Sequence, residues 1–163
     1  MRRSLPLLLL TLSACSSGSP AAVHPTVAPT HKAPVVRPKP KPAFAVTTLQ
    51  VATKFTSADG NLGCDIESAY ARCDPDRHDW PIPPRPGDCA SGWGHGIEMQ
   101  AGTKASFFCG SDSVKGGRLV LAAGHAFRNG FVQCDALTAT TIHCHGTTDS
   151  HGFTISQAKY SLT

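Results

Sequence analysis

Three histidines near the C-terminus offer the clearest chemistry in this chain. His143 and His145 flank Cys144, and His151 follows six residues later. Because alternate side chains of a β-strand share one face, a Cys144 that points inward would place both neighbouring histidines outward together. Two imidazoles on one strand suit a transition metal, and the loop 146–150 could bring His151 to the same ion. The prediction is nevertheless that these are exposed strand and turn histidines and that the chain needs no cofactor, with a metal site at His143, His145 and His151 as the alternative.

Catalytic motifs are scarce by comparison. The chain contains no G-x-S-x-G nucleophile elbow and no H-E-x-x-H zinc motif. Asp74, Asp76 and Asp79 could suggest a glycoside hydrolase, which needs two carboxylates about 5–9.5 Å apart. Aspartates in such a Pro- and Asp-containing segment more commonly cap turns through their own backbone. We therefore predict no catalytic residue and no enzymatic activity, with a small cell-envelope hydrolase as the remaining enzymatic alternative.

Six of the seven cysteines lie between residues 64 and 144, and their number and spacing indicate disulfides. An even number of cysteines in a small exported domain is typical of a disulfide framework. Zinc sites built from cysteine use C-x₂₋₄-C pairs, whereas here the intervals hold 8, 15, 19, 24 and 9 residues. The cysteines concerned are Cys64, Cys73, Cys89, Cys109, Cys134 and Cys144.

Six cysteines allow 15 pairings, and the local sequence favours one of them. Residues 63–74 and 133–145 both contain a Cys-Asp step near their start, and eight or nine residues separate that cysteine from a second one. In a β-hairpin this spacing places the two sulfurs opposite each other on one face, where Cα atoms come close enough for a disulfide. The prediction is Cys64–Cys73 and Cys134–Cys144, which leaves Cys89–Cys109.

The rest of residues 46–163 is typical of short strands. Segments rich in Val, Ile, Thr and Phe alternate with Gly, Asp, Asn and Ser turns, and no stretch has a sustained helical period. We predict an all-β fold, a small disulfide-stapled antiparallel sandwich or barrel-like domain built of hairpins. Besides the two cysteine hairpins, the expected strands are 47–55, 96–100, 104–109, 118–122, 130–136 and 152–156.

The N-terminus is typical of a bacterial lipoprotein. Arg2 and Arg3 precede a short apolar run that is too short to cross a bilayer, and Leu-Ser-Ala-Cys follows at 12–15. We predict a lipoprotein signal peptide over residues 1–14 and lipidation of Cys15. The alternative is an ordinary cleaved secretory signal.

Residues 15–45 are predicted to be a disordered tether rich in Pro, Ala and Lys. Seven of the 13 prolines lie there, and proline disfavours both helix and sheet. Residues 46–163 hold nine Lys or Arg and eleven Asp or Glu, so the net charge of +4 arises from the leader and the tether. A nucleic-acid-binding domain would carry its basic patch on the folded part, so we expect no nucleic-acid partner. Contact of the basic tether with anionic lipid or cell-wall polymer is possible on charge alone.

The domain resembles a small cysteine-rich domain of exported actinobacterial proteins, many of them mycobacterial lipoproteins, for which no activity is established. The resemblance covers most of residues 54–163. It is carried by FTSADGNLGC at 55–64, ARCD at 71–74, Trp80 with its prolines, DC at 88–89, GWG at 92–94, FCGSD at 108–112, Cys134, Cys144, GFTIS at 152–156 and Tyr160. A turn glycine is missing near 138–140. The resemblance implies a shared fold and a cell-envelope location, and it transfers no catalytic residue.

Together these features predict an envelope lipoprotein, lipid-anchored to the outer face of the cytoplasmic membrane. We expect a non-enzymatic binding or scaffolding module for an extracytoplasmic partner, either a protein or a cell-wall polymer. The alternative is a metal-binding lipoprotein that uses His143, His145 and His151.

Overall fold

A computed structural model describes residues 43–163 of this chain. The predicted signal peptide (1–14), Cys15 and nearly all of the predicted tether (15–45) lie outside the described residues.

Residues 43–163 form twelve β-strands and no helix, which confirms the all-β prediction. Residues 43–163 therefore contain no helix that is long and apolar enough to cross a membrane. The strands are β1 (Ala45–Thr48), β2 (Thr53–Ser57), β3 (Leu62–Ile66), β4 (Tyr70–Pro75), β5 (Trp93–Gln100), β6 (Ser106–Cys109), β7 (Leu119–Leu121), β8 (His125–Asn129), β9 (Val132–Thr138), β10 (Thr141–Gly146), β11 (Gly152–Ile155) and β12 (Tyr160–Leu162).

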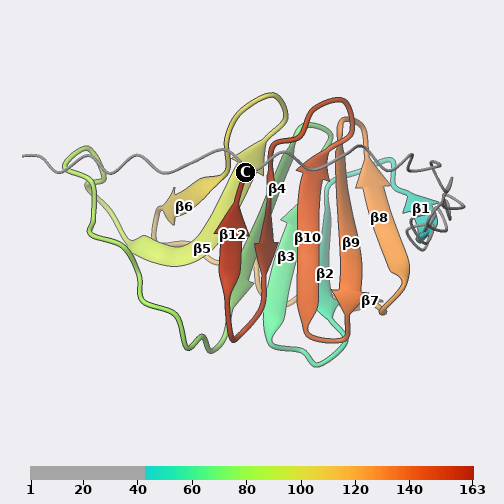
Figure 1. The fold of residues 1–163 in the computed structure, drawn as a ribbon, viewed down its shortest axis with the longest axis horizontal. Helices are drawn as coiled ribbons and strands as arrows, with labels where there is room; N and C mark the ends of the chain where they lie inside the picture. The colour runs from blue at the N-terminus through green and yellow to red at the C-terminus, as the bar shows by residue number, and fades with distance from the viewer. Residues whose placement is uncertain (1–42) are drawn as a thin grey trace, which may run out of the picture. The chain divides into compact units, whose positions relative to one another are not determined.

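The strands form two six-stranded sheets that pack face to face. Sheet A has the order β1-β8-β9-β10-β11-β12, and sheet B has the order β6-β5-β4-β3-β2-β7. In Figure 1 the orange and red strands of sheet A lie in front of the green and cyan strands of sheet B. The predicted antiparallel hairpins account for most of the pairing, but one edge strand of each sheet is parallel to its neighbour: β1 to β8, and β7 to β2.

The expected single strand at 47–55 is in fact two strands in different sheets. The chain leaves sheet A after Thr48 and enters sheet B at Thr53. The crossover is held by Asn129, whose side-chain amide donates a hydrogen bond to the Val51 carbonyl at 2.9 Å. The Val- and Thr-rich composition of 47–55 predicts strand in both halves but carries no signal for the corner between them.

The core lies between the sheets and contains two of the three disulfides. Cys64–Cys73 joins β3 to β4 and Cys134–Cys144 joins β9 to β10, and all four cysteines are fully buried. The third disulfide, Cys89–Cys109, joins the loop before β5 to the end of β6. The first two are the pairs that the hairpin spacing predicts, and the third is the pair that this prediction leaves. Aliphatic and aromatic side chains of both sheets fill the space around them, including Phe55, Leu62, Ile66, Ile97, Leu121, Val132, Ile142, Phe153 and Ile155.

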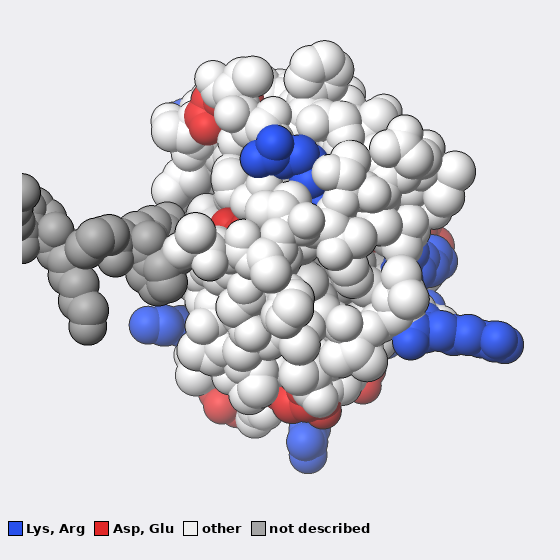
Figure 2. All heavy atoms as spheres, turned by 90° about the vertical axis from the view of Figure 1, so that its right-hand side faces the viewer, with Lys and Arg blue, Asp and Glu red and all other residues white. Residues whose placement is uncertain are grey.

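The surface beside β1 has no continuous basic patch. Figure 2 views the side of the molecule on which β1 lies, and Lys and Arg appear there as separate side chains on a mostly uncharged surface. This view agrees with the slightly negative charge of the domain, and on this face it gives no support to a nucleic-acid interface.

Candidate functional site

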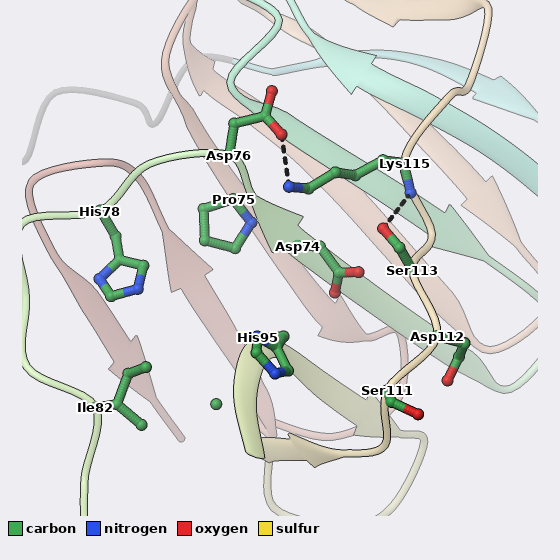
Figure 3. A pocket seen from close by; sticks show the side chains of 11 residues that line it. Asp74, Pro75, Asp76, His78, Ile82, His95, Ser111, Asp112, Ser113 and Lys115 are labelled. Atoms are coloured by element: carbon green, nitrogen blue, oxygen red, sulfur yellow. Dashed lines mark hydrogen bonds and ion pairs between the residues drawn. The ribbon is translucent and has the colours of Figure 1, made fainter. Parts of the chain in front are cut away.

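Two features of the described residues could bind a ligand, a groove on sheet B and a side-chain cluster on sheet A. The groove has a volume of about 350 Å³ and lies where the loop after β4 meets the loop after β6. Figure 3 shows its polar lining, with carboxylates and imidazoles from separate segments facing the same space. The titratable side chains that line it are Asp74, Asp76, His78, His95, Asp112 and Lys115.

Each carboxylate of the groove is already ion-paired. Asp74 and Asp112 both bind Arg72, at 2.8 and 3.0 Å, and Asp76 binds the ammonium group of Lys115. Asp74 is also nearly inaccessible, and its second oxygen accepts the backbone N–H of Val114 at 3.0 Å. These ion pairs and hydrogen bonds hold the loop 110–118 against sheet B. The carboxylates of the groove therefore have a structural role, and they are better suited to polar contacts with a ligand than to proton transfer.

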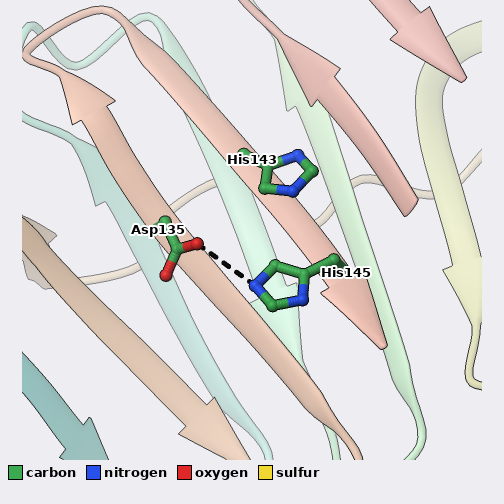
Figure 4. A group of neighbouring side chains, drawn as sticks. All are labelled: Asp135, His143 and His145. Carbon is green, nitrogen blue, oxygen red and sulfur yellow. Dashed lines mark hydrogen bonds and ion pairs between the residues drawn. The ribbon is translucent and has the colours of Figure 1, made fainter. Parts of the chain in front are cut away.

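The cluster on sheet A follows from strand register. Cys134 pairs with Cys144 across β9 and β10, which places Asp135 directly opposite His143. Because side chains alternate along a strand, the buried cysteines point into the core while Asp135, His143 and His145 share the outer face. Figure 4 shows the three side chains together on these two strands.

The ligand atoms of the cluster are close enough to share one ion. One ligand atom from each of Asp135, His143 and His145 lies within 4.8 Å of the others. A tetrahedral Zn²⁺ with bonds of about 2.0–2.2 Å holds its ligand atoms roughly 3.4 Å apart. Side-chain shifts on the order of 1 Å would therefore complete the site.

Both imidazoles are oriented by backbone carbonyls. Nδ1 of His143 lies 3.1 Å from the Phe153 carbonyl oxygen, and Nδ1 of His145 lies 2.9 Å from that of Gly146. Nδ1 of His143 also lies 3.0 Å from the Thr154 hydroxyl, which can donate or accept. Because a carbonyl oxygen only accepts, the tautomer with a proton on Nδ1 satisfies both carbonyl contacts, and its Nε2 has the lone pair that a metal needs. Metal-binding histidines are commonly oriented in this way by a hydrogen bond from their other nitrogen.

Nε2 of His145 faces a carboxylate oxygen of Asp135 at 3.1 Å. In this contact the ring nitrogen is the donor and the carboxylate oxygen is the acceptor. A metal ion bound by both groups would take the place of that proton.

Asp135 is the most firmly held member of the cluster. Asp135 is only 3% exposed, and its other carboxylate oxygen accepts a hydrogen bond from the Gln133 amide at 2.7 Å. The guanidinium of Arg128 in turn donates to Gln133 at 2.9 Å. Burial alone would raise the pKa of Asp135, but the hydrogen bonds from His145 and Gln133 and the charges of both histidines outweigh it and lower the pKa. The carboxylate is thus ionised at neutral pH and suited to bind a cation.

The structure places Asp135, and not His151, beside the two histidines. His145 is opposite Gly152 on β11, so His151 lies one residue before the position that would share their face. Sequence analysis missed Asp135, although the signal was present. The predicted disulfide Cys134–Cys144 already implies that the residues next to each cysteine, Asp135 and His143, are neighbours.

One serine and lysine pair has the S-x-x-K spacing of some acyl-transferring enzymes. The Ser156 hydroxyl, however, donates to the backbone carbonyl of Lys159 at 3.0 Å and accepts the Lys159 backbone N–H at 3.2 Å. These bonds close the turn between β11 and β12 and engage no side-chain ammonium. The three-residue separation of Ser156 and Lys159 is therefore explained by this turn.

A scan against protein-family models finds no match to this chain, and searches of curated proteins and of solved structures find none either. The function proposed for this chain therefore depends on the geometry of its described residues.

Proposed function

We propose that this chain is a lipoprotein of the cell envelope whose β domain binds a divalent transition metal through Asp135, His143 and His145. In this proposal Cys15 carries the lipid anchor, residues 15–45 form the tether, and the domain faces outward from the cytoplasmic membrane. The domain binds its metal without transforming a substrate.

The observation that supports this proposal is the convergence of one ionised carboxylate and two carbonyl-oriented imidazoles on adjacent strands. Two nitrogens and one oxygen suit Zn²⁺, Cu²⁺, Ni²⁺ or Co²⁺ and do not suit Mg²⁺ or Ca²⁺, which prefer oxygen ligands. The six cysteines of residues 43–163 are all joined in disulfides, so they offer the site no thiolate that would favour Cu⁺. We expect Cu²⁺ to bind more tightly than Zn²⁺, and Zn²⁺ more tightly than Co²⁺.

The test is metal titration of the purified full-length protein with its disulfides intact. We expect one Zn²⁺ per chain in equilibrium dialysis and a Co²⁺ absorption spectrum without sulfur charge-transfer bands. Asp135→Asn, His143→Gln and His145→Gln should each weaken binding by at least about tenfold, because each removes or weakens one of only three protein ligands.

His151→Gln is the matched control, because His151 lies in the same part of the chain but outside the cluster. Its affinity should equal that of the wild-type protein. If the wild-type protein retains no metal, the proposal fails. If His145→Gln retains metal as well as the wild type does, the metal binds elsewhere and this site is refuted.

The groove on sheet B favours a second candidate function, the binding of a polar extracytoplasmic partner such as a cell-wall polymer or protein. Its polar lining and its volume of about 350 Å³ would accommodate a hydroxyl-rich ligand. His95 is exposed and lines the groove. If this candidate is correct, His95→Ala should weaken co-sedimentation of the protein with purified cell wall, and His125→Ala, at an exposed site outside the groove, should not.

A further inference from the structure

We propose that the Cys134–Cys144 disulfide is a positioning element of the metal site, so that the site binds its metal more weakly when this bond is absent. This inference rests on the proposed metal-binding function and adds a requirement to it. The two cysteines would act through the strands that carry the ligands, without touching the ion.

The disulfide and the three metal ligands lie on the same two strands, on opposite faces of sheet A. Cys134 precedes Asp135 on β9, and Cys144 lies between His143 and His145 on β10. The disulfide and the cluster therefore occupy opposite faces of the same short piece of the strand pair. The cross-link joins Cα atoms 4.0 Å apart, and it fixes the strand separation at the point where the three ligands must converge.

The disulfide also supports the register of the hairpin. The pairing of β9 with β10 shifts between Thr141 and Ile142, next to the cluster. A slip of one residue would turn every side chain of a strand to the opposite face and separate His143 and His145 from Asp135. The bond between the directly opposed Cys134 and Cys144 opposes such a slip, together with the burial of Ile142 in the core.

The imidazoles are also held from neighbouring segments. His143 contacts the Phe153 carbonyl and the Thr154 hydroxyl of β11, and His145 contacts the Gly146 carbonyl of its own strand. The contact between His145 and Asp135 joins β10 to β9. A bound metal would replace that contact, whereas the disulfide beside it would stay in place.

The chain contains its own control for this idea. Cys64–Cys73 also joins neighbouring antiparallel strands, with Cα atoms 4.1 Å apart and both cysteines fully buried. Its sequence separation is 9, against 10 for Cys134–Cys144. It lies in sheet B, whereas all three metal ligands lie in sheet A. Removal of either disulfide should cost similar stability, but only one removal should affect the metal site.

The experiment compares Cys134→Ala/Cys144→Ala with Cys64→Ala/Cys73→Ala in the full-length protein, at a temperature where circular dichroism shows both variants folded. Zn²⁺ affinity is measured by competition with a chelating dye, and site geometry by the Co²⁺ absorption spectrum. We expect Cys134→Ala/Cys144→Ala to bind roughly 10- to 100-fold more weakly, with an altered spectrum, as when the support of metal ligands is removed. The Cys64→Ala/Cys73→Ala variant should keep the wild-type affinity and spectrum.

A second measurement uses the wild-type protein and does not depend on how the variants fold. Coupling between two equilibria is reciprocal, so in a thiol redox buffer bound Zn²⁺ should lower the equilibrium fraction of reduced Cys134–Cys144 by more than that of reduced Cys64–Cys73. Peptide mapping after quenching reports each bond. Equal effects of Zn²⁺ on both bonds, or equal metal affinities in both double variants, would overturn the inference. Absence of metal binding by the wild-type protein would instead refute the proposed function itself.

Discussion

Arg72 is the largest fully buried side chain of the described residues, and it organises the groove side of the molecule. Its guanidinium makes a two-pronged contact with Asp74, at 2.8 Å for both bonds, and also binds the carbonyl and carboxylate of Asp112. Phe108 covers it, with the guanidinium carbon 3.2 Å from the ring centre. Burial opposes its charge, but the carboxylates outweigh that effect and raise the pKa of Arg72. A buried charge of this kind is tolerated only while its partners stay in place.

Gly96 allows this ion pair to form. A Cβ at Gly96 would overlap Oδ1 of Asp74, the oxygen that accepts from Arg72. We therefore predict that Gly96→Ala lowers the free energy of unfolding by about 1–3 kcal/mol, as overpacking of a tight site does. Gly87→Ala is the control, because a Cβ there would meet nothing within 4 Å. Urea unfolding of both variants checks the prediction, and equal stabilities would contradict it.

At the scale of elements, the two cysteine hairpins are the central strands of their sheets. β3 and β4 pack against β9 across the core, and each hairpin has a strand on both sides. β1 is different, since it is a parallel edge strand and all four of its residues are exposed. Strands with few buried contacts open at a lower free energy than core strands.

We therefore predict a ranking in hydrogen exchange. Amides of β9 and β10 that bond within the sheet should exchange last, near the limit set by global unfolding, and those of β1 should exchange first among the strands of sheet A. Exchange measured by NMR under native conditions tests this ranking. Protection of β1 equal to that of β9 would show that this edge is covered by something beyond the contacts described here.

At the scale of the whole molecule, stability should depend on acid pH through Asp135. Its pKa is lowered in the folded protein, so its contribution is complete above the unfolded value of about 3.9 and is lost as pH falls through the folded pKa. Between neutral pH and that range the contribution stays constant. Asp135→Asn removes it at every pH.

The expected outcome is that the wild-type protein loses more unfolding free energy than Asp135→Asn does as pH decreases below about 4. Unfolding by urea at a series of pH values, without added metal, measures both curves. The two proteins should converge in strongly acidic solution. Parallel curves over the whole acid range would contradict the assignment of a lowered pKa to Asp135.

Much of the fold follows from the sequence because the signals are local. Short Val-, Ile-, Thr- and Phe-rich segments between turn residues predict an all-β domain, and the spacing of 64 with 73 and of 134 with 144 predicts two hairpin disulfides. Alternation along a strand also predicts that His143 and His145 share a face. Each of these inferences needs only residues that are near one another in the chain.

Only the tertiary structure decided which segments meet across long separations. It divided residues 47–55 between two sheets, made β1 and β7 parallel edges, and buried Arg72 under the loop 110–118. It also chose Asp135 over His151 as the third member of the histidine cluster. The physical reason is that a strand's own pattern specifies its two faces, whereas the identity of its neighbours depends on how both sheets pack around one core.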